Sequence, residues 1–221
     1  MVLRSRVFFL LLAFCAAALA QTPAAPAPTG PRIFHDPSTG ITYFYPRRFT
    51  PEQAPAKQAC AHATLSGSSA SPVGASSFVL SSIGSACPSL LNEAVANLDA
   101  FTRKQALGQL KQYGKPEITR DATRYSIDGH PASITIAAVK HPAPYDPNSI
   151  APPKMTYVAK ACVLGEVPDK HSKQTLAEQT RHILCFDFTT QHKDLLPLML
   201  AFTVQFDGHD PEPLVPGGIL H

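Results

Sequence analysis

The sequence predicts an α+β domain: an antiparallel sheet flanked by helices, with long irregular loop insertions. Two β-type runs, at 155–164 and 183–190, lie on either side of a polar connection, and such runs pair readily as antiparallel strands. An apolar stripe at helical spacing follows Ser89. The 22 prolines are spread through linkers and long connections, which indicates a modest body of sheet and helix that carries large insertions.

One antiparallel register of the two β-type runs matches four cross-strand pairs at once. They are a cysteine pair, an opposite-charge pair and two small–large apolar pairs. The four pairs are Cys162–Cys185, Lys160–Asp187, Ala161–Phe186 and Ala159–Phe188. Because successive side chains of a strand alternate between faces, the first two pairs share one face and the apolar pairs share the other. This register is therefore the one that a sheet with a buried face would select.

Regular structure is also predicted in several other segments. These are a hairpin at 33–45, a strand at 76–83, a helix capped by Ser89 that ends before Gly114, strands at 117–127 and 132–140, and a short helix at 193–205. The dipeptide Asp128-Gly129 between two β-type runs is a strong hairpin signal. The helix should bury one stripe, formed by Leu91, Val95, Leu98 and Phe101. We expect long surface loops at 50–75 and 141–153.

The first twenty residues predict an export signal. Arg4 and Arg6 form a basic start, an apolar stretch follows, and Ala-Leu-Ala at 18–20 is a cleavage site of the small-x-small kind, so the mature chain should begin at Gln21. The alternative is a lipoprotein anchored through Cys15. It is disfavoured because Phe14 stands where a small residue would precede such a cysteine. The protein is therefore expected to be exported, either periplasmic or secreted.

Composition divides the chain into four regions. The export signal at 1–20 precedes an Ala/Pro-rich disordered tether at 21–31, a single α+β domain at 32–207 and a flexible tail at 208–221. The formal net charge of +3 falls to +1 once the two arginines of the signal are removed. A nearly neutral chain argues against a nucleic-acid surface. No later run is long and apolar enough to predict a membrane span after signal removal.

Four cysteines remain after the signal, and an even count in an exported chain favours disulfides. The strand register selects Cys162–Cys185, which leaves Cys60–Cys87 as the second pair. Each bridge would stabilise the fold by about 2–4 kcal/mol. Reduced, buried thiols are the alternative. A zinc site is less well supported because the chain has no Cys-x-x-Cys pair.

Three short motifs resemble the PsbP-like family of small α+β domains. Residues 34–46 contain the pattern D-x-x-T-G-I-x-[FY]-x-Y-P, residues 127–132 resemble the family's "idG-x-pa" turn, and residues 202–206 resemble its closing "Sf-x-F" element. The chain departs from the family at Arg47, where a tryptophan is usual, and in its inserted loops and cysteines. The resemblance implies an α/β/α sandwich and a family that mostly supplies non-catalytic accessory or binding modules. It transfers no catalytic residue.

The chain shows no motif for a catalytic, cofactor or metal site. Its nine histidines form neither His-x-His nor His-Glu-x-x-His, and Gly-x-Ser-x-Gly is absent. No Gly-rich phosphate loop leads from a strand into a helix, so no cofactor is expected. Basic and aromatic residues do not alternate as a nucleic-acid surface would require.

The expected function is that of an exported, non-enzymatic accessory or binding domain for an envelope protein or a small ligand. Binding residues are commonly carried on loops over a rigid scaffold, so the candidate surface comprises Arg47, Arg48 and Tyr145 near the two insertions. The alternative is a metal-dependent or hydrolytic envelope enzyme. Its site would be assembled from dispersed residues such as His130, His182 and Asp187. A purely structural role is the third option.

Overall fold

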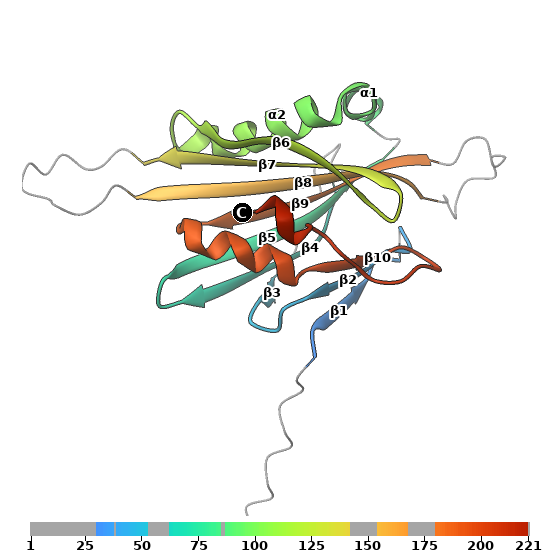
Figure 1. Cartoon of the computed structure of the whole chain (residues 1–221), viewed down its shortest axis with the longest axis horizontal. Helices are drawn as coiled ribbons and strands as arrows, with labels where there is room; N and C mark the ends of the chain where they lie inside the picture. The colour runs from blue at the N-terminus through green and yellow to red at the C-terminus, as the bar shows by residue number, and fades with distance from the viewer. Residues whose placement is uncertain are drawn as a thin grey trace, which may run out of the picture. The chain divides into compact units, whose positions relative to one another are not determined.

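The structure, a computed structural model, describes residues 30–37, 39–52, 62–84, 87–141, 154–167 and 180–220. All of them from Pro31 onward belong to one compact unit, Pro31–His221. A seven-stranded antiparallel sheet lies in the middle, two helices cover one of its faces, and a small sheet with a 3₁₀ helix covers the other (Figure 1). The expected α+β class, with an antiparallel sheet between helical layers, is confirmed.

The large sheet has the strand order β3-β4-β5-β9-β8-β7-β6. Its strands are β3 (Thr50–Glu52), β4 (His62–Ser71), β5 (Gly74–Ile83), β6 (Glu117–Ile127), β7 (His130–Lys140), β8 (Met155–Val167) and β9 (Thr180–Thr190). The small sheet has the order β1-β2-β10-β11. Its strands are β1 (Arg32–His35), β2 (Thr42–Tyr45), β10 (Thr203–Gln205) and β11 (Glu212–Pro213). The helices are α1 (Pro88–Ala96), α2 (Leu98–Leu110), η1 (Lys111–Tyr113), η3 (Lys193–Ala201) and η4 (Gly217–Ile219).

The predicted register of β8 and β9 is confirmed in every pair. Cys162 and Cys185 form a disulfide with Cα atoms 4.2 Å apart. Two pairs further along, on the same face, Lys160 Nζ lies 2.6 Å from the Asp187 carboxylate, and both side chains are buried. The partners of the two small alanines are Phe186 and Phe188.

The two predicted hairpins are also confirmed. β1 pairs with β2 from Arg32 opposite Tyr45 onward, and β6 pairs with β7 around the turn at Asp128 and Gly129. Both turn residues have positive φ, 50° and 76°. That conformation matches the twist of the flanking strands in a two-residue hairpin and explains the Asp-Gly sequence.

The two faces of the large sheet bury different kinds of side chain. On one face α2 presents residues spaced three or four apart, namely Leu98, Phe101, Thr102, Ala106 and Leu110. On the other face, an aromatic cluster joins the large sheet to the small one. Phe78 lies at its centre, with ring centroids 5.3 Å from Phe49 and 5.0 Å from Phe202.

The expected single helix is instead two helices, α1 and α2, and this prediction was wrong. Asn97 interrupts the helical backbone with an extended conformation (φ −158°, ψ 93°), and its side-chain oxygen accepts the Ala100 N–H at 3.0 Å. An Asn at this position caps a new helix better than it continues an old one. Val95, expected on the buried stripe, is 40% exposed as a result. Ser89 lies inside α1, whose N-cap residue is Cys87.

The expected loop at 50–75 contains strands β3 and β4, so this prediction was also wrong. Strand β4 is rich in Ser, Ala and Gly, residues with little preference for strands. A residue without a Cβ is needed at position 67 because the Phe78 ring of β5 packs directly over Gly67. An ideal Cβ added to Gly67 would lie 2.8 Å from the Phe78 ring. The packing, not the intrinsic propensity, selects the strand.

The C-terminal segment, expected to be a flexible tail, is packed in its middle part. β11 pairs with β10, and the Leu214 N–H donates to the Phe202 carbonyl oxygen at 2.9 Å. Leu214 and Val215 are buried in the main core. The proline-rich composition predicted a flexible tail, although these two apolar residues pack against the core.

Several predictions fall outside the described residues. They concern the export signal at 1–20, most of the tether at 21–31, Cys60 and Tyr145. Cys87 is described and buried. The Cys60–Cys87 bridge therefore stays a prediction.

Breaking the buried Lys160–Asp187 pair should destabilise the protein strongly. Lys160→Met leaves a buried carboxylate without its ammonium partner, and we expect the free energy of unfolding to fall by about 3–5 kcal/mol. Urea denaturation measures this loss. The double variant Lys160→Met/Asp187→Leu should regain most of the stability because neither charge remains buried.

The exposed pair Lys104–Glu93 provides the control for this charge-pair prediction. Lys104→Met should cost no more than about 1 kcal/mol because water screens that pair. Equal losses for Lys160→Met and Lys104→Met would contradict a structural role of the buried pair.

The protein should also lose stability at alkaline pH through two buried phenols. Burial raises the pKa of Tyr43 and of Tyr125 above the ordinary value, and the Asp36 carboxylate adds to the effect at Tyr43. The unfolded chain releases these protons from about pH 10, whereas the folded chain retains them. Stability contributed by the two phenols is therefore complete below pH 10 and falls as the pH rises further.

The variant Tyr43→Phe/Tyr125→Phe should show a flatter decline of unfolding free energy above about pH 10. Denaturant titrations at a series of alkaline pH values measure the slope. Tyr113→Phe changes an exposed ring and should keep the wild-type slope. If the double variant and the wild type decline in parallel, the two phenols do not limit alkaline stability.

Candidate functional site

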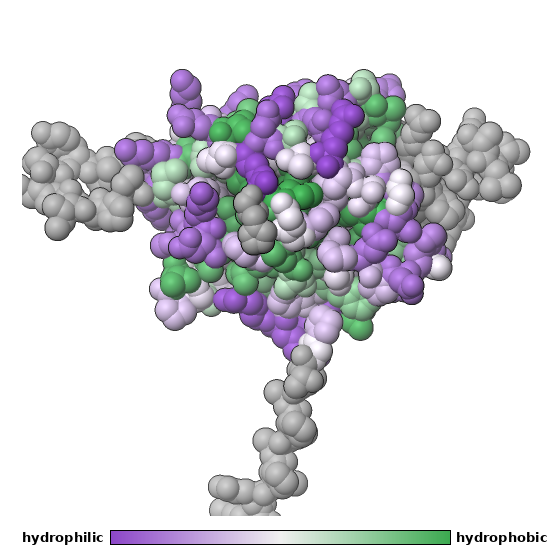
Figure 2. All heavy atoms as spheres, viewed as in Figure 1, coloured by the Kyte–Doolittle hydropathy of each residue, from purple (hydrophilic) through white to green (hydrophobic). Residues whose placement is uncertain are grey.

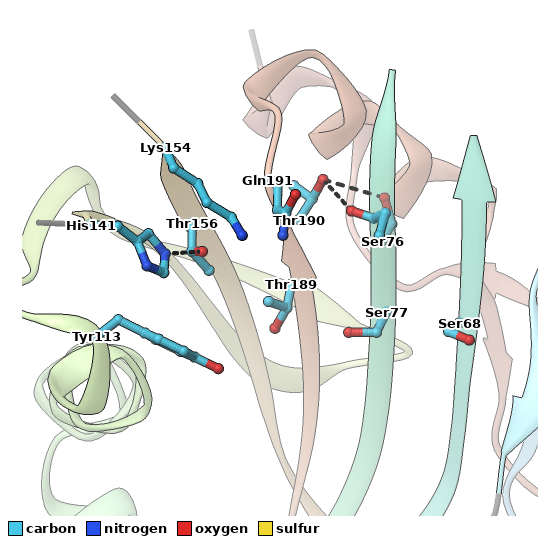
Figure 3. A pocket seen from close by; sticks show the side chains of 11 residues that line it. Ser68, Ser76, Ser77, Tyr113, His141, Lys154, Thr156, Thr189, Thr190 and Gln191 are labelled. Carbon is cyan, nitrogen blue, oxygen red and sulfur yellow. Dashed lines mark hydrogen bonds between the residues drawn. The ribbon is translucent and has the colours of Figure 1, made fainter. Parts of the chain in front are cut away.

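A polar groove lies at the edge of the helical layer, where the large sheet continues beyond α2. Helix α2 packs on β6, β7 and β8, and the groove runs from the end of η1 across β8 and β9 to β5 and β4 (Figure 3). Its volume is about 260 Å³, close to the lower end of the roughly 300–1,000 Å³ range typical of small-molecule sites. Its lining residues are Ser68, Ala75, Ser76, Ser77, Tyr113, His141, Lys154, Thr156, Thr189, Thr190 and Gln191.

A row of hydroxyl groups forms the floor of this groove. Ser68 of β4 faces Ser77 of β5, and Ser77 faces Thr189 of β9 in the strand register. Directly opposed residues of neighbouring strands share a face, so the three side chains lie side by side, about 4.7–4.9 Å apart per strand. Thr189 follows Asp187 by two residues, which places the row on the same face as α2 and the buried ion pair.

The wall of the groove is built where β7 ends and β8 begins. The His141 N–H donates to the Lys154 carbonyl oxygen at 2.8 Å, which brings these two residues together. His141 Nε2 lies 2.7 Å from the Thr156 hydroxyl. The Tyr113 ring packs on the His141 ring with centroids 5.2 Å apart. Figure 3 shows Tyr113 and Lys154 extending from this wall over the strands.

Five polar side chains in the groove make no hydrogen bond to any residue that the structure describes. They are Ser77, Tyr113, Lys154, Thr189 and Gln191. By contrast, Thr190 accepts from Ser76 at 3.3 Å and is buried. The five groups are thus available to a ligand, and two of them, Ser77 and Thr189, are half-buried on the floor.

The groove is electrically asymmetric. Lys154 and His141 provide basic groups at the β8 end, and none of the lining residues is acidic. At the opposite end, the Ser68 hydroxyl donates to the Glu52 carboxylate. A ligand that carries a negative charge would therefore place it at the Lys154 end, because the Glu52 end would repel it.

The candidate surface from the sequence is only partly related to this groove. Arg48 Nε lies 3.4 Å from the Ser69 hydroxyl, and Ser69 points to the opposite face of β4 from Ser68. Arg47 is exposed beside it. Tyr145 lies outside the described residues, in the segment 142–153 whose flanking residues, His141 and Lys154, line the groove.

The sheet separates Asp187 from the two histidines of the alternative enzyme site. His182 and Asp187 stand five positions apart on β9, and the pairing with β8 is continuous between them. Their side chains therefore point to opposite faces. His130 packs on the Phe206 ring at 4.6 Å, on the aromatic side. The alternative hypothesis, in which all three residues form one site, is contradicted by this arrangement.

No metal centre is found in the described part of the chain. No group of three or more His, Cys, Asp or Glu side chains there is placed to hold an ion. The described helices also include none that is long and apolar enough to cross a membrane.

The surface outside the groove is mixed. Figure 2 shows hydrophilic and hydrophobic residues interspersed over one face of the molecule. The large exposed hydrophobic side chains of the described residues come from four different places and are Ile33, Val73, Val95 and Tyr113. Single exposed hydrophobic residues are normal. Tyr113 differs because it borders a groove with a hydrogen-bonding floor.

Sequence reasoning missed the residues of the groove. Ser77 and Thr189 stand among many serines and threonines, and Tyr113, His141 and Lys154 are far apart along the chain. One weak signal was present. Polar residues alternate with apolar ones in β5, where Ser77 precedes Phe78, and this pattern indicates that one face of the strand meets solvent.

The fold is similar to that of two solved structures. The solution structure of cyanobacterial PsbP (CyanoP) from Synechocystis sp. PCC 6803 matches with a TM-score of 0.50 and 10% identity, over 82% of this chain and 96% of that one. The crystal structure of LpqN, involved in cell envelope biogenesis of Mycobacterium tuberculosis, matches with a TM-score of 0.44 and 17% identity, over 79% and 90%. No protein-family model and no curated protein matches the chain. The match to cyanobacterial PsbP confirms the PsbP-like fold that the sequence motifs indicated, and the likeness concerns the fold alone.

Proposed function

We propose that this protein is an exported, non-enzymatic binding domain of the cell envelope or the extracellular space, and that it binds its ligand in the polar groove. The observation that carries the proposal is the set of five polar side chains directed into one groove without a partner among the described residues. A hollow with a few convergent polar groups is the usual form of a small-molecule site.

Export is supported by the sequence and by the disulfide. Residues 1–20 combine a basic start, an apolar stretch and a small-x-small cleavage site. The Cys162–Cys185 bridge belongs to a class of bond that persists mainly in oxidising compartments. Both features agree with a periplasmic or secreted protein.

A catalytic alternative would have to use the His141–Thr156 pair. The 2.7 Å distance between His141 Nε2 and the Thr156 hydroxyl has the geometry of a base and a nucleophile. However, Thr156 is only 6% exposed, so its hydroxyl is poorly placed to attack a substrate. The pair is better explained as a support that fixes the His141 ring under Tyr113.

The proposal predicts a processed protein that retains a small ligand. The full chain, produced in its own host and recovered from the envelope or culture fluid, should have an intact mass that begins at Gln21. Under native conditions the mass spectrum should show an additional bound species. Ser77→Ala/Thr189→Val removes two floor hydroxyls with little change in shape and should abolish that species.

Arg47→Ala/Arg48→Ala is the matched control, since neither residue lines the groove. This variant should retain the ligand. An unprocessed chain found only in the cytosol would contradict the proposed export. Loss of the ligand from the arginine variant, with retention by the groove variant, would move the binding surface to the opposite face of the sheet.

A further inference from the structure

The groove has a chemistry that matches one class of ligand, and this inference rests on the binding function proposed above. Three features of the groove have to be satisfied together: a single ammonium group at one end, hydroxyl and amide groups along the floor, and an exposed aromatic ring at the wall. Each restricts the ligand in a different way.

The ammonium group of Lys154 favours an anionic ligand with a single negative charge. Lys154 extends over the strands in Figure 3, and no described side chain pairs with it. A phosphate group usually requires several cations, or backbone N–H groups at a helix N-terminus. The groove offers one lysine with His141 beside it, and it is bounded by strands and by the end of η1. A single carboxylate fits this donor set better than a phosphate does.

The hydroxyl and amide groups of the floor favour a ligand that is rich in hydroxyl groups. Ser77 and Thr189 each offer a hydroxyl that can donate and accept, and Gln191 adds an amide that does both. Such groups are weak partners for an apolar molecule, because burying them unpaired costs free energy. They are good partners for the alternating hydroxyl groups of a sugar ring, which also donate and accept.

The aromatic ring at the wall favours a ligand with a flat, partly apolar surface. The Tyr113 ring is 41% exposed and is held from behind by the His141 ring. Tyrosine is enriched at binding surfaces because its ring is apolar and its hydroxyl is polar. The C–H face of a sugar ring can pack on such an aromatic ring while its hydroxyl groups face the floor.

We propose that the groove binds a carboxylate-bearing saccharide. The carboxylate pairs with Lys154, the ring hydroxyl groups bond to Ser77, Thr189 and Gln191, and the C–H face of the ring packs on Tyr113. The volume of about 260 Å³ accommodates one sugar unit. The Glu52 carboxylate at the far end fixes the direction by repelling the anionic group.

Calorimetric titration of the full chain tests the proposal with three probes: trigalacturonic acid, neutral galactotriose and inorganic phosphate. The two trisaccharides share ring number and most hydroxyl groups and differ in their carboxylates. We expect trigalacturonic acid to bind, galactotriose to bind about tenfold more weakly or worse, since a charge-assisted bond is lost, and phosphate to show no binding.

The variants locate the contacts. Lys154→Met should weaken trigalacturonic acid binding about tenfold or more and should not change the weaker binding of galactotriose. Lys115→Met removes an exposed lysine that does not line the groove and should leave both affinities unchanged. Tyr113→Ala should weaken both trisaccharides, whereas Tyr113→Phe, which keeps the ring, should retain most of the affinity.

Other results overturn the inference in distinguishable ways. Equal affinity for the two trisaccharides would show that the carboxylate does not contribute to binding. Phosphate binding that depends on Lys154 would show that the groove is a simple anion site. If neither trisaccharide binds while the host-derived species is still lost from Ser77→Ala/Thr189→Val, the ligand class is wrong and the binding function stands. If no host-derived species is found either, both proposals fail.

Discussion

The pairing of β8 with β9 is the constraint on which the rest of the molecule depends. Its register places Phe186 and Phe188 in the aromatic core and Asp187 beside Lys160 under the helical layer. A slip of one residue would exchange the two sets, placing a carboxylate among aromatic rings and two phenylalanines beside the buried ammonium group under the helices. The same register places Thr189 on the floor of the groove. Folding and the candidate site thus rest on one arrangement of hydrogen bonds.

The parts of the fold that could be predicted from sequence are those with mutually specific partners. Only one register of β8 and β9 pairs cysteine with cysteine, lysine with aspartate and alanine with phenylalanine. In the same way, an Asp-Gly turn defines a hairpin. Strand β4 has no such partners along the chain. Its glycine at position 67 is explained only by the Phe78 ring, which packs over it from β5. The break at Asn97 was equally hidden, because an apolar stripe continues across it in the sequence.

The groove could not be predicted because it depends on the order of strands. Tyr113, Lys154 and Thr189 are brought together only when β9 lies between β8 and β5. Serine and threonine are common in any exposed strand, so neither stands out. The sequence did indicate the region of the groove, since the residues that flank the predicted insertion at 141–153 meet at its wall. It could not show that the flanking residues, and not Arg47 and Arg48, would border a groove.

Contact with water is enough to explain a polar face of a sheet. The residues at the wall of the groove are what distinguish a binding site from a solvated face. Antiparallel sheets commonly bury one face and expose the other, so Ser68, Ser77 and Thr189 alone would indicate only contact with water. Tyr113 is different, because contact with water does not stabilise an exposed aromatic ring. His141 holds that ring at the edge of the hydroxyl row, and Thr156 holds His141 in turn. Exposed groups whose orientation is fixed by the residues behind them are the arrangement that a preformed binding site requires.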